Sequence, residues 1–310
     1  VMLAVLLVRL LSGIAYAIIA QRDVPGLGLR DARFALMRPL LRQGIWMSLS
    51  GALTQFLLYA DRFIIGAMLT LSAVAFYATP LDLIIRLWIV PVAVTQTMLP
   101  AIASSFRELP QNTALLVKRG ALIVMLLSLP ASLVLIPGAE LFLRLWLGEA
   151  FAAGGGPVLR ILAFGIFFSC LAFVPGVLLE AIGRPDVTAK ISLALALIFL
   201  PLSAALLPWL GIEGAAMAWA ARCVLDCLGR CWAAARLYPA ARETMRDLLW
   251  PILPAGLGLA LLVPMGGWLW PALLAALVFG LVFTAGWAIA APQDKSSALA
   301  LISRKGRHSA

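Results

Sequence analysis

The sequence predicts an all-α membrane protein, a polytopic bundle of about nine transmembrane helices. Of its 310 residues, 63% are hydrophobic and only 12% are charged, and the mean hydropathy is +1.03. A soluble domain would carry about 25% charged residues. No run shows the ten-residue alternation of a transmembrane barrel strand. The windows able to cross the membrane as helices are 1–20, 44–69, 72–104, 119–137, 157–182, 188–208, 212–234, 248–268 and 270–291.

Basic residues gather in every second connection between these windows, which is typical of cytoplasmic loops. The alternate connections contain Arg144 as their only base. A cytoplasmic C-terminus then places Val1 outside, and the net charge of +10 belongs to the inner surface. This distribution argues against a nucleic-acid partner. The segments predicted to be cytoplasmic are 21–43, 105–119, 183–190, 235–247 and 292–310.

The N-terminal region leaves two questions open. A chain that begins outside with Val1 suggests that further helices precede it. A signal peptide is the alternative, because Ala15-Tyr16-Ala17 resembles a cleavage site, although Arg9 interrupts the apolar stretch. Residues 21–43 read as a basic amphipathic linker on the membrane surface, with a solvated linker as the alternative.

Several stretches, in order, carry a family resemblance. They read YADRFIIGAMLTLSAVAFYATPLDL, MLPAIASSF, LRLWLGEAF, ILAFGIFFSCLAFVPGVLLEAIGRPD and PWLGIEGAAMAWAARCVLD. Together they resemble the polysaccharide and oligosaccharide flippases of the multidrug/oligosaccharidyl-lipid/polysaccharide exporter superfamily. The resemblance implies two six-helix lobes, of which residues 44–236 would be the second. Residues 1–20 would then end the first lobe, 237–291 would add two helices, and 292–310 would form a basic tail.

The resemblance also implies a task in cell-surface polysaccharide biosynthesis. It is the movement of a polyprenyl-pyrophosphate-linked oligosaccharide from the cytoplasmic to the external leaflet of the bacterial inner membrane by alternating access. The implied partners are this lipid, membrane lipids and other polysaccharide-assembly membrane proteins, with no cofactor. A pyrophosphate cannot cross hydrocarbon unaided, so the carrier needs a hydrated cavity with cations.

Three charges of the seventh span fall on one stripe. Arg222, Asp226 and Arg230 lie at i, i+4 and i+8, which leaves an excess of positive charge there. Arginine offers planar donors that suit phosphate oxygens. We therefore expect Arg222 and Arg230, together with Arg86, to bind the pyrophosphate, and Asp226 to serve as a coupling group or charge partner. A structural ion pair is the alternative.

The charged side chains in the second and third spans should face protein or water rather than lipid. Asp61 and Arg62 stand roughly 7 Å from the middle of their span, too deep to reach water easily. We interpret them as a mainly architectural pair, with a coupling role as the alternative. Asp82 and Arg86 share a helix face and can pair with each other. Between LIIRLWIV and VAVTQTML, Pro91 is the predicted hinge.

Other polar residues indicate no enzyme. Arg160 and Glu180 lie near the ends of the fifth span, where their side chains should reach headgroups. The cysteines of the seventh span read as packing residues rather than metal ligands. A drug exporter of the same superfamily should show an acidic cavity, and a polyprenyl-glycan transferase or polymerase should carry catalytic acids outside, where the longest loop offers only Glu140 and Glu149.

The predicted topology can be tested by single-cysteine labelling. In a background lacking the four native cysteines, we expect Lys305→Cys to react with a membrane-impermeant maleimide only after the cells are opened, because the basic tail is cytoplasmic. Efficient labelling in intact cells would contradict the orientation.

Overall fold

The described part of the protein is helical throughout, which confirms the predicted fold class. The structure is a computed structural model that describes residues 2–23, 34–265 and 269–290. Within these residues, six helices are long and apolar enough to cross a membrane. The protein is therefore a multi-pass membrane protein with an all-α bundle.

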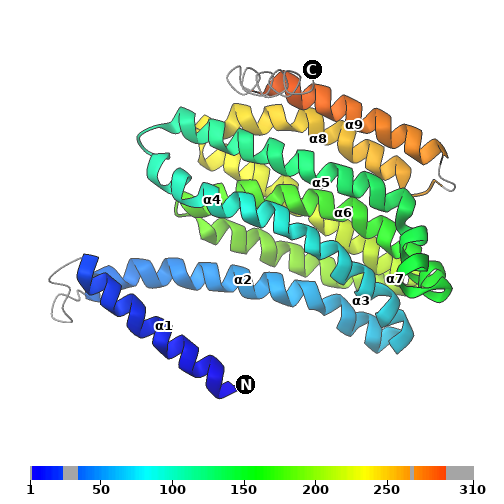
Figure 1. The fold of residues 1–310 in the computed structure, drawn as a ribbon, viewed down its shortest axis with the longest axis horizontal. Coiled ribbons are helices and arrows are strands. Elements are labelled where there is room, and N and C mark those ends of the chain that lie inside the picture. The colour runs from blue at the N-terminus through cyan, green and yellow to red at the C-terminus, as the bar shows by residue number, and fades with distance from the viewer. Residues whose placement is uncertain (1, 24–33, 266–268, 291–310) are drawn as a thin grey trace, which may run out of the picture. The chain divides into compact units, whose positions relative to one another are not determined.

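The helices follow the predicted spans closely (Figure 1). They are α1 (Met2–Asp23), α2 (Phe34–Met68), α3 (Leu71–Ile84), the 3₁₀ segment η2 (Ile85–Trp88), α4 (Ile89–Ser105), α5 (Pro110–Leu147), α6 (Glu149–Ala181), α7 (Pro185–Leu237), the 3₁₀ segment η3 (Pro239–Ala241), α8 (Arg242–Leu262) and α9 (Leu269–Ile289). Two compact units, 1–45 and 46–310, divide the chain, and the second holds all contacts discussed below.

The N-terminal helices differ in part from the prediction. The predicted linker 21–43 includes the end of α1 and the first turns of α2, while residues 24–33 and the tail 292–310 lie outside the described residues. Of α1, the described residues include a shorter apolar stretch, Leu6–Tyr16, and the spans at 1–20 and 44–69 stay predictions. In α2 the apolar stretch is interrupted by Gln55, Asp61 and Arg62.

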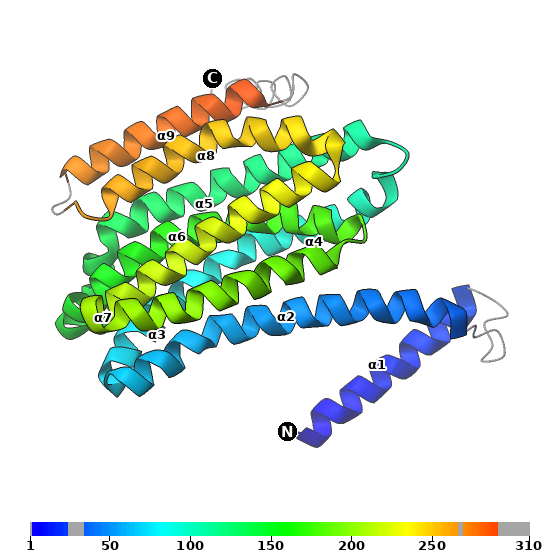
Figure 2. The same cartoon turned by 180° about the vertical axis from the view of Figure 1, so that it is seen from behind.

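Helix α7 contains two predicted spans, 188–208 and 212–234, joined by a reversal. The backbone of Gly211 takes φ 57° and ψ −144°, a conformation that favours glycine because a Cβ would be strained there. The two arms then run back along each other, so that Gly229 lies beside Ile191 (Figure 2). α7 is thus two helices joined at Gly211, and they supply two neighbouring walls of the bundle.

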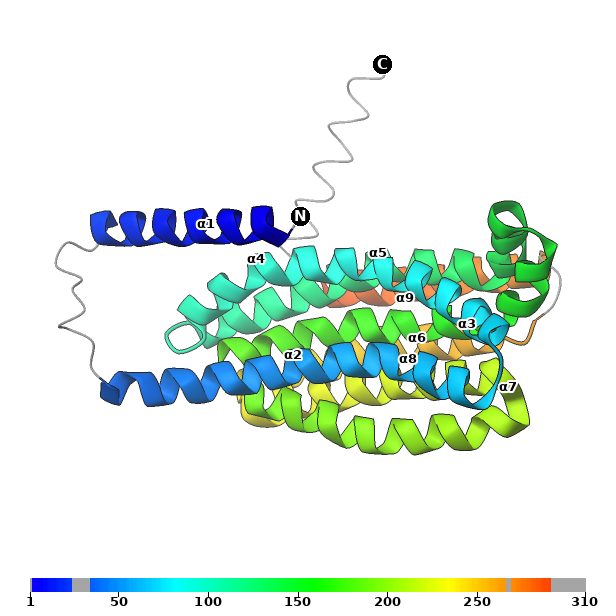
Figure 3. The ribbon, with the colours of Figure 1, turned by 90° about the horizontal axis from the view of Figure 1, so that it is seen from below.

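Helix α6 forms the centre of the second unit. It packs against α5 on one side and α7 on the other (Figure 3), and it also contacts α3, α4 and α8. In its most apolar window 89% of the residues are buried, against 17% in α9. The apolar side chains of α6 therefore contact mostly other parts of the protein, whereas α9 presents most of its surface outward.

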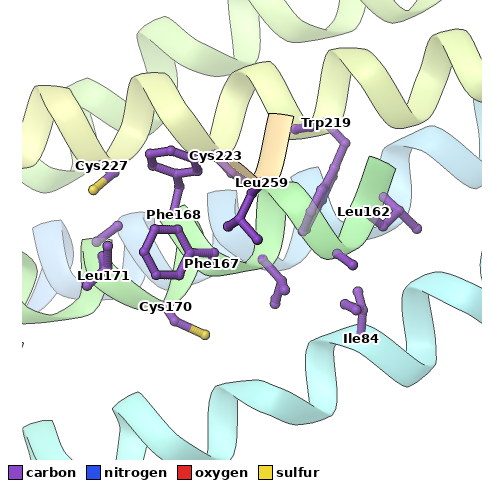
Figure 4. Packing of buried hydrophobic residues seen from close by; sticks show 14 of the residues in the cluster. Ile84, Leu162, Phe167, Phe168, Cys170, Leu171, Trp219, Cys223, Cys227 and Leu259 are labelled. Atoms are coloured by element: carbon purple, nitrogen blue, oxygen red, sulfur yellow. The ribbon is translucent and has the colours of Figure 1, made fainter. Parts of the chain in front are cut away.

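Aromatic and small residues close the core around α6. The rings of Phe167 and Phe168 meet edge to face at 5.3 Å (Figure 4). Where α6 crosses α7, a Cβ on Gly165 would lie 2.9 Å from the Cα of Ala220 and 2.7 Å from the Trp219 ring. Glycine here permits a helix approach that a side chain would prevent.

Exposed tryptophans mark both ends of the bundle. Successive turns alternate between the ends, and the indoles beside the turns at the end predicted to be external are Trp146, Trp209 and Trp270, exposed by 54%, 86% and 70%. Trp232 and Trp250 are exposed toward the opposite end, where the basic connections lie. Amphipathic indoles favour the level of the lipid headgroups, so these two sets fit the two interfaces of a membrane.

We expect Gly165→Ala to destabilise the protein by about 1–3 kcal/mol, because the new methyl group must push α6 away from the α7 backbone. Thermal unfolding in detergent measures the effect. Gly138→Ala in α5 is the matched control, since a Cβ there meets nothing within 4 Å. Equal melting temperatures for the two variants would contradict the close approach.

Candidate functional site

The second unit holds a half-open cavity of about 460 Å³. Its walls come from α2, η2, α4, α6 and both arms of α7. The reversal at Gly211 is essential to this arrangement, because it brings Ser192 of the first arm and Asp226 of the second to the same cavity. A volume of this size is typical of small-molecule sites.

Four charged residues line the cavity. Arg222, Asp226 and Arg230 come from the second arm of α7, and Glu180 comes from α6. Arg230 Nε donates to Asp226 Oδ1 at 2.8 Å, and the guanidinium of Arg230 also interacts electrostatically with Glu180. Glu180 was expected to reach the headgroups, and it lies instead at the cavity. The positive excess of the stripe is therefore offset by a carboxylate from a neighbouring helix.

Space for Arg230 is provided by Gly176 of α6. A Cβ at this position would lie 2.9 Å from Arg230 Nη1, so the guanidinium lies directly across the glycine. Arg230 and Asp226 are mostly buried, with 16% and 15% of their side chains exposed. The pair is thus held inside the bundle while its edge lines the cavity.

Arg222 is held differently, by aromatic faces. Its guanidinium carbon lies 5.4 Å from the centre of the Phe199 ring and 5.8 Å from that of Trp219, within the range of cation–π attraction. Its Nε is buried and makes no hydrogen bond, and among the described residues Arg222 forms no salt bridge. Asp61 is close enough to interact electrostatically. Arg222 therefore keeps donors that an anion in the cavity can use.

Asp61 and Arg62 do not pair with each other. Asp61 is fully buried and accepts a hydrogen bond of 2.5 Å from the Tyr77 hydroxyl. Arg62 forms an ion pair with Asp82 of α3 and lies over the Tyr59 ring. Adjacent helical residues point about 100° apart, so the two charges reach different neighbours. The interpretation as one architectural pair was wrong in its partners, since both residues tie α2 to α3.

Arg86 lies outside the cavity. The chain tightens into the 3₁₀ segment η2 directly after α3, and this changes the direction in which Arg86 points relative to Asp82. Arg86 is exposed, and Asp82 is paired with Arg62, so the predicted Asp82–Arg86 pair was wrong. Pro91 is buried in the first turn of α4, just after η2, and its role as a hinge stays a prediction.

Several residues at the cavity were not predicted. Trp88 of η2 lines it, and its indole Nε1 donates to Ser169 Oγ of α6 at 3.0 Å. The amides of Gln55 and Gln96 also line it. These residues are neutral, and hydropathy and charge patterns therefore gave no signal for them. A tryptophan and a glutamine interrupting apolar runs were the available clues.

The remaining polar residues are engaged elsewhere. Arg160 binds Glu140 at 2.8 Å, and Arg144 binds Glu149 at 2.6 Å. Cys170, Cys223 and Cys227 are buried and Cys231 is partly buried, all as free thiols. Within the described ranges, no group of three or more His, Cys, Asp and Glu residues is placed to hold a metal ion.

Together these features define a multi-pass membrane protein with a charged cavity inside its helix bundle. Residues 2–154 match the model of a family described as polysaccharide biosynthesis protein. A protein of Shigella flexneri named "Putative O-antigen transporter" is 29% identical over 231 residues, which cover 74% of this chain and 54% of that protein. The chain thus spans about half the length of this curated relative. These findings support the assignment that the sequence resemblance indicated, to a family of polysaccharide biosynthesis proteins and flippases.

The family match ends at the start of α6, before Arg222 and Arg230. The arguments about these two residues therefore depend on the geometry of the cavity.

A double-mutant cycle tests the revised pairing. We expect Arg62→Ala and Asp82→Ala to be coupled by about 0.5–2 kcal/mol in unfolding free energy, because each removes the same ion pair. Asp82→Ala combined with Arg86→Ala should be additive. Coupling between Asp82 and Arg86 that equals or exceeds the first value would restore the original assignment.

Proposed function

We propose that this protein acts in moving a polyprenyl-pyrophosphate-linked oligosaccharide from the cytoplasmic to the external leaflet of the bacterial inner membrane, by alternating access, as a transporter rather than an enzyme. The observation that carries the proposal is the half-open cavity with Arg222 on its wall, whose Nε–H has no hydrogen-bond partner. The family match and the name of the Shigella relative support a substrate of this kind.

The charges suit the diphosphate rather than the lipid tail. Moving an unpaired anion into hydrocarbon is strongly unfavourable, so a carrier must replace the water around it with its own donors. Arg222 can supply a planar guanidinium whose charge is only partly balanced. Arg230 donates its Nε–H to Asp226 Oδ1 and has other N–H groups as well. The apolar tail has no need of the cavity and can stay in the bilayer.

The spacing of the two arginines suggests successive contacts. Eight residues separate Arg222 from Arg230, which corresponds to roughly 12 Å between their backbones along a helix. Arg230 lies nearer the end of α7 that is predicted to be cytoplasmic, and Arg222 lies deeper in the bundle. In this proposal the headgroup enters from the cytoplasmic side, contacts Arg230 first and then reaches Arg222 deeper in the bundle.

Two other functions fit the structure less well. An exporter of cationic drugs would need free acids in the cavity, but Asp226 is bound by Arg230 and Glu180 faces the same guanidinium. A polyprenyl-glycan transferase or polymerase would need free external acids, but Glu140 and Glu149 are each bound to an arginine.

We expect Arg222→Ala to lower transport at least tenfold, because the proposed contact with the cargo is lost. The protein should stay at its normal level in the membrane, because the substitution breaks no salt bridge. Arg222→Lys should restore transport only in part, since it keeps the charge and loses the planar donors. The measurements are protein level and cytoplasmic accumulation of the lipid-linked oligosaccharide in cells.

The matched control is Arg107→Ala, which removes the same side chain from an exposed site between α4 and α5. It should leave transport unchanged. An Arg222→Ala variant that is abundant and transports normally would overturn the assignment of the cavity as the substrate site.

A further inference from the structure

Trp88 is fixed at the cavity by two contacts. Its indole donates to Ser169 Oγ at 3.0 Å, and its ring meets that of Phe173 edge to face, with centres 5.9 Å apart. Trp88, Ser169 and Phe173 all line the cavity. The orientation of the indole is thus set from α6, although Trp88 itself lies on η2 between α3 and α4.

The indole lies at the level of Arg222. Ser169, which accepts the hydrogen bond from Trp88, also lies against Cys223, the residue that follows Arg222. A flat aromatic group and the residue that carries the guanidinium therefore line the cavity at about the same depth. A ligand that spans them would carry an anionic group beside a ring-shaped group.

Neutral hydrogen-bonding groups complete the lining. The amides of Gln55 and Gln96 lie on the cavity and form no hydrogen bond within the part of the chain described here. Thr188 is only 2% exposed, lines the same cavity, and its hydroxyl has no partner. A buried hydroxyl without a partner is unfavourable in the empty protein and can be satisfied by a polar ligand.

We propose that Trp88 forms a sugar-binding platform, on which the sugar ring attached to the diphosphate stacks while Arg222 binds the phosphate. The inference rests on the proposed function and adds a specificity-determining residue to it. The C–H groups on one face of a pyranose ring carry partial positive charge and are attracted to the negative face of an aromatic ring. The amides of Gln55 and Gln96 can both donate to and accept from sugar hydroxyls.

A second hollow has an entirely different lining. Between α5 and α9 lies a groove of about 140 Å³ whose lining, including Leu126 and Phe283, is entirely apolar. The cavity at Trp88 differs in having amides, hydroxyls and charges around its indole. Its chemistry therefore matches a glycosyl diphosphate rather than a hydrocarbon chain.

The test compares two lipids on the purified full-length protein in nanodiscs. One is polyprenyl pyrophosphate, and the other is the same lipid carrying one hexose. We expect the hexose to raise the affinity of the parent protein, and Trp88→Leu to abolish that gain while leaving the affinity for the bare lipid within twofold. Trp88→Phe should keep most of the gain, because a stacking face remains.

Trp232→Leu is the matched control, since it removes an exposed indole outside the cavity. Retained binding of the bare lipid shows that the Trp88 variant is folded. If Trp88→Leu keeps the full gain, or weakens both lipids equally, the sugar platform is overturned and the proposed function stands. If the parent protein binds neither lipid, the proposed function fails and this inference fails with it.

Discussion

Hydrocarbon offers no hydrogen bonds, and this single constraint decides where the charged side chains of the spans go. One carboxylate oxygen of Asp61 accepts a hydrogen bond from Tyr77, Arg62 pairs with Asp82, and Asp226 pairs with Arg230. The first two contacts join α2 to α3, and the third stiffens one arm of α7. Because these charges are paired within the protein, the polar cavity can exist inside a bundle whose outer surface is apolar. Arg222 lines the cavity without a salt bridge among the described residues, and this gives the cavity its chemical character.

Glycines decide how closely the helices around the cavity approach. Gly165 lets α6 touch the backbone of α7, and Gly176 leaves the space that the guanidinium of Arg230 occupies. Gly211 reverses α7, so that one segment forms two walls. The absence of a side chain therefore has three effects around the cavity. It allows close packing at Gly165, makes room for a charged side chain at Gly176 and permits the change of direction at Gly211.

Hydropathy alone predicted the helices well, because each span must be long and apolar, and the i, i+4 rule placed Asp226 next to Arg230 on one face. Neither rule could identify an ion-pair partner that lies on a different helix. Asp82 was assigned to Arg86 on its own helix and binds Arg62 of α2 instead, while Glu180 was placed at the headgroups and lines the cavity. Partners of this kind depend on rotation of neighbouring helices and on local tightening such as η2, neither of which leaves a periodic signal in the sequence.

The aromatic setting of Arg222 has a kinetic consequence for any cargo. The rings of Phe199 and Trp219 steady the guanidinium without a tightly bound counter-ion. An arriving anion therefore does not have to displace a carboxylate of the protein from this arginine. Capture of an anion at this arginine therefore requires no rearrangement of an ion pair, whereas its release leaves the guanidinium without a carboxylate partner.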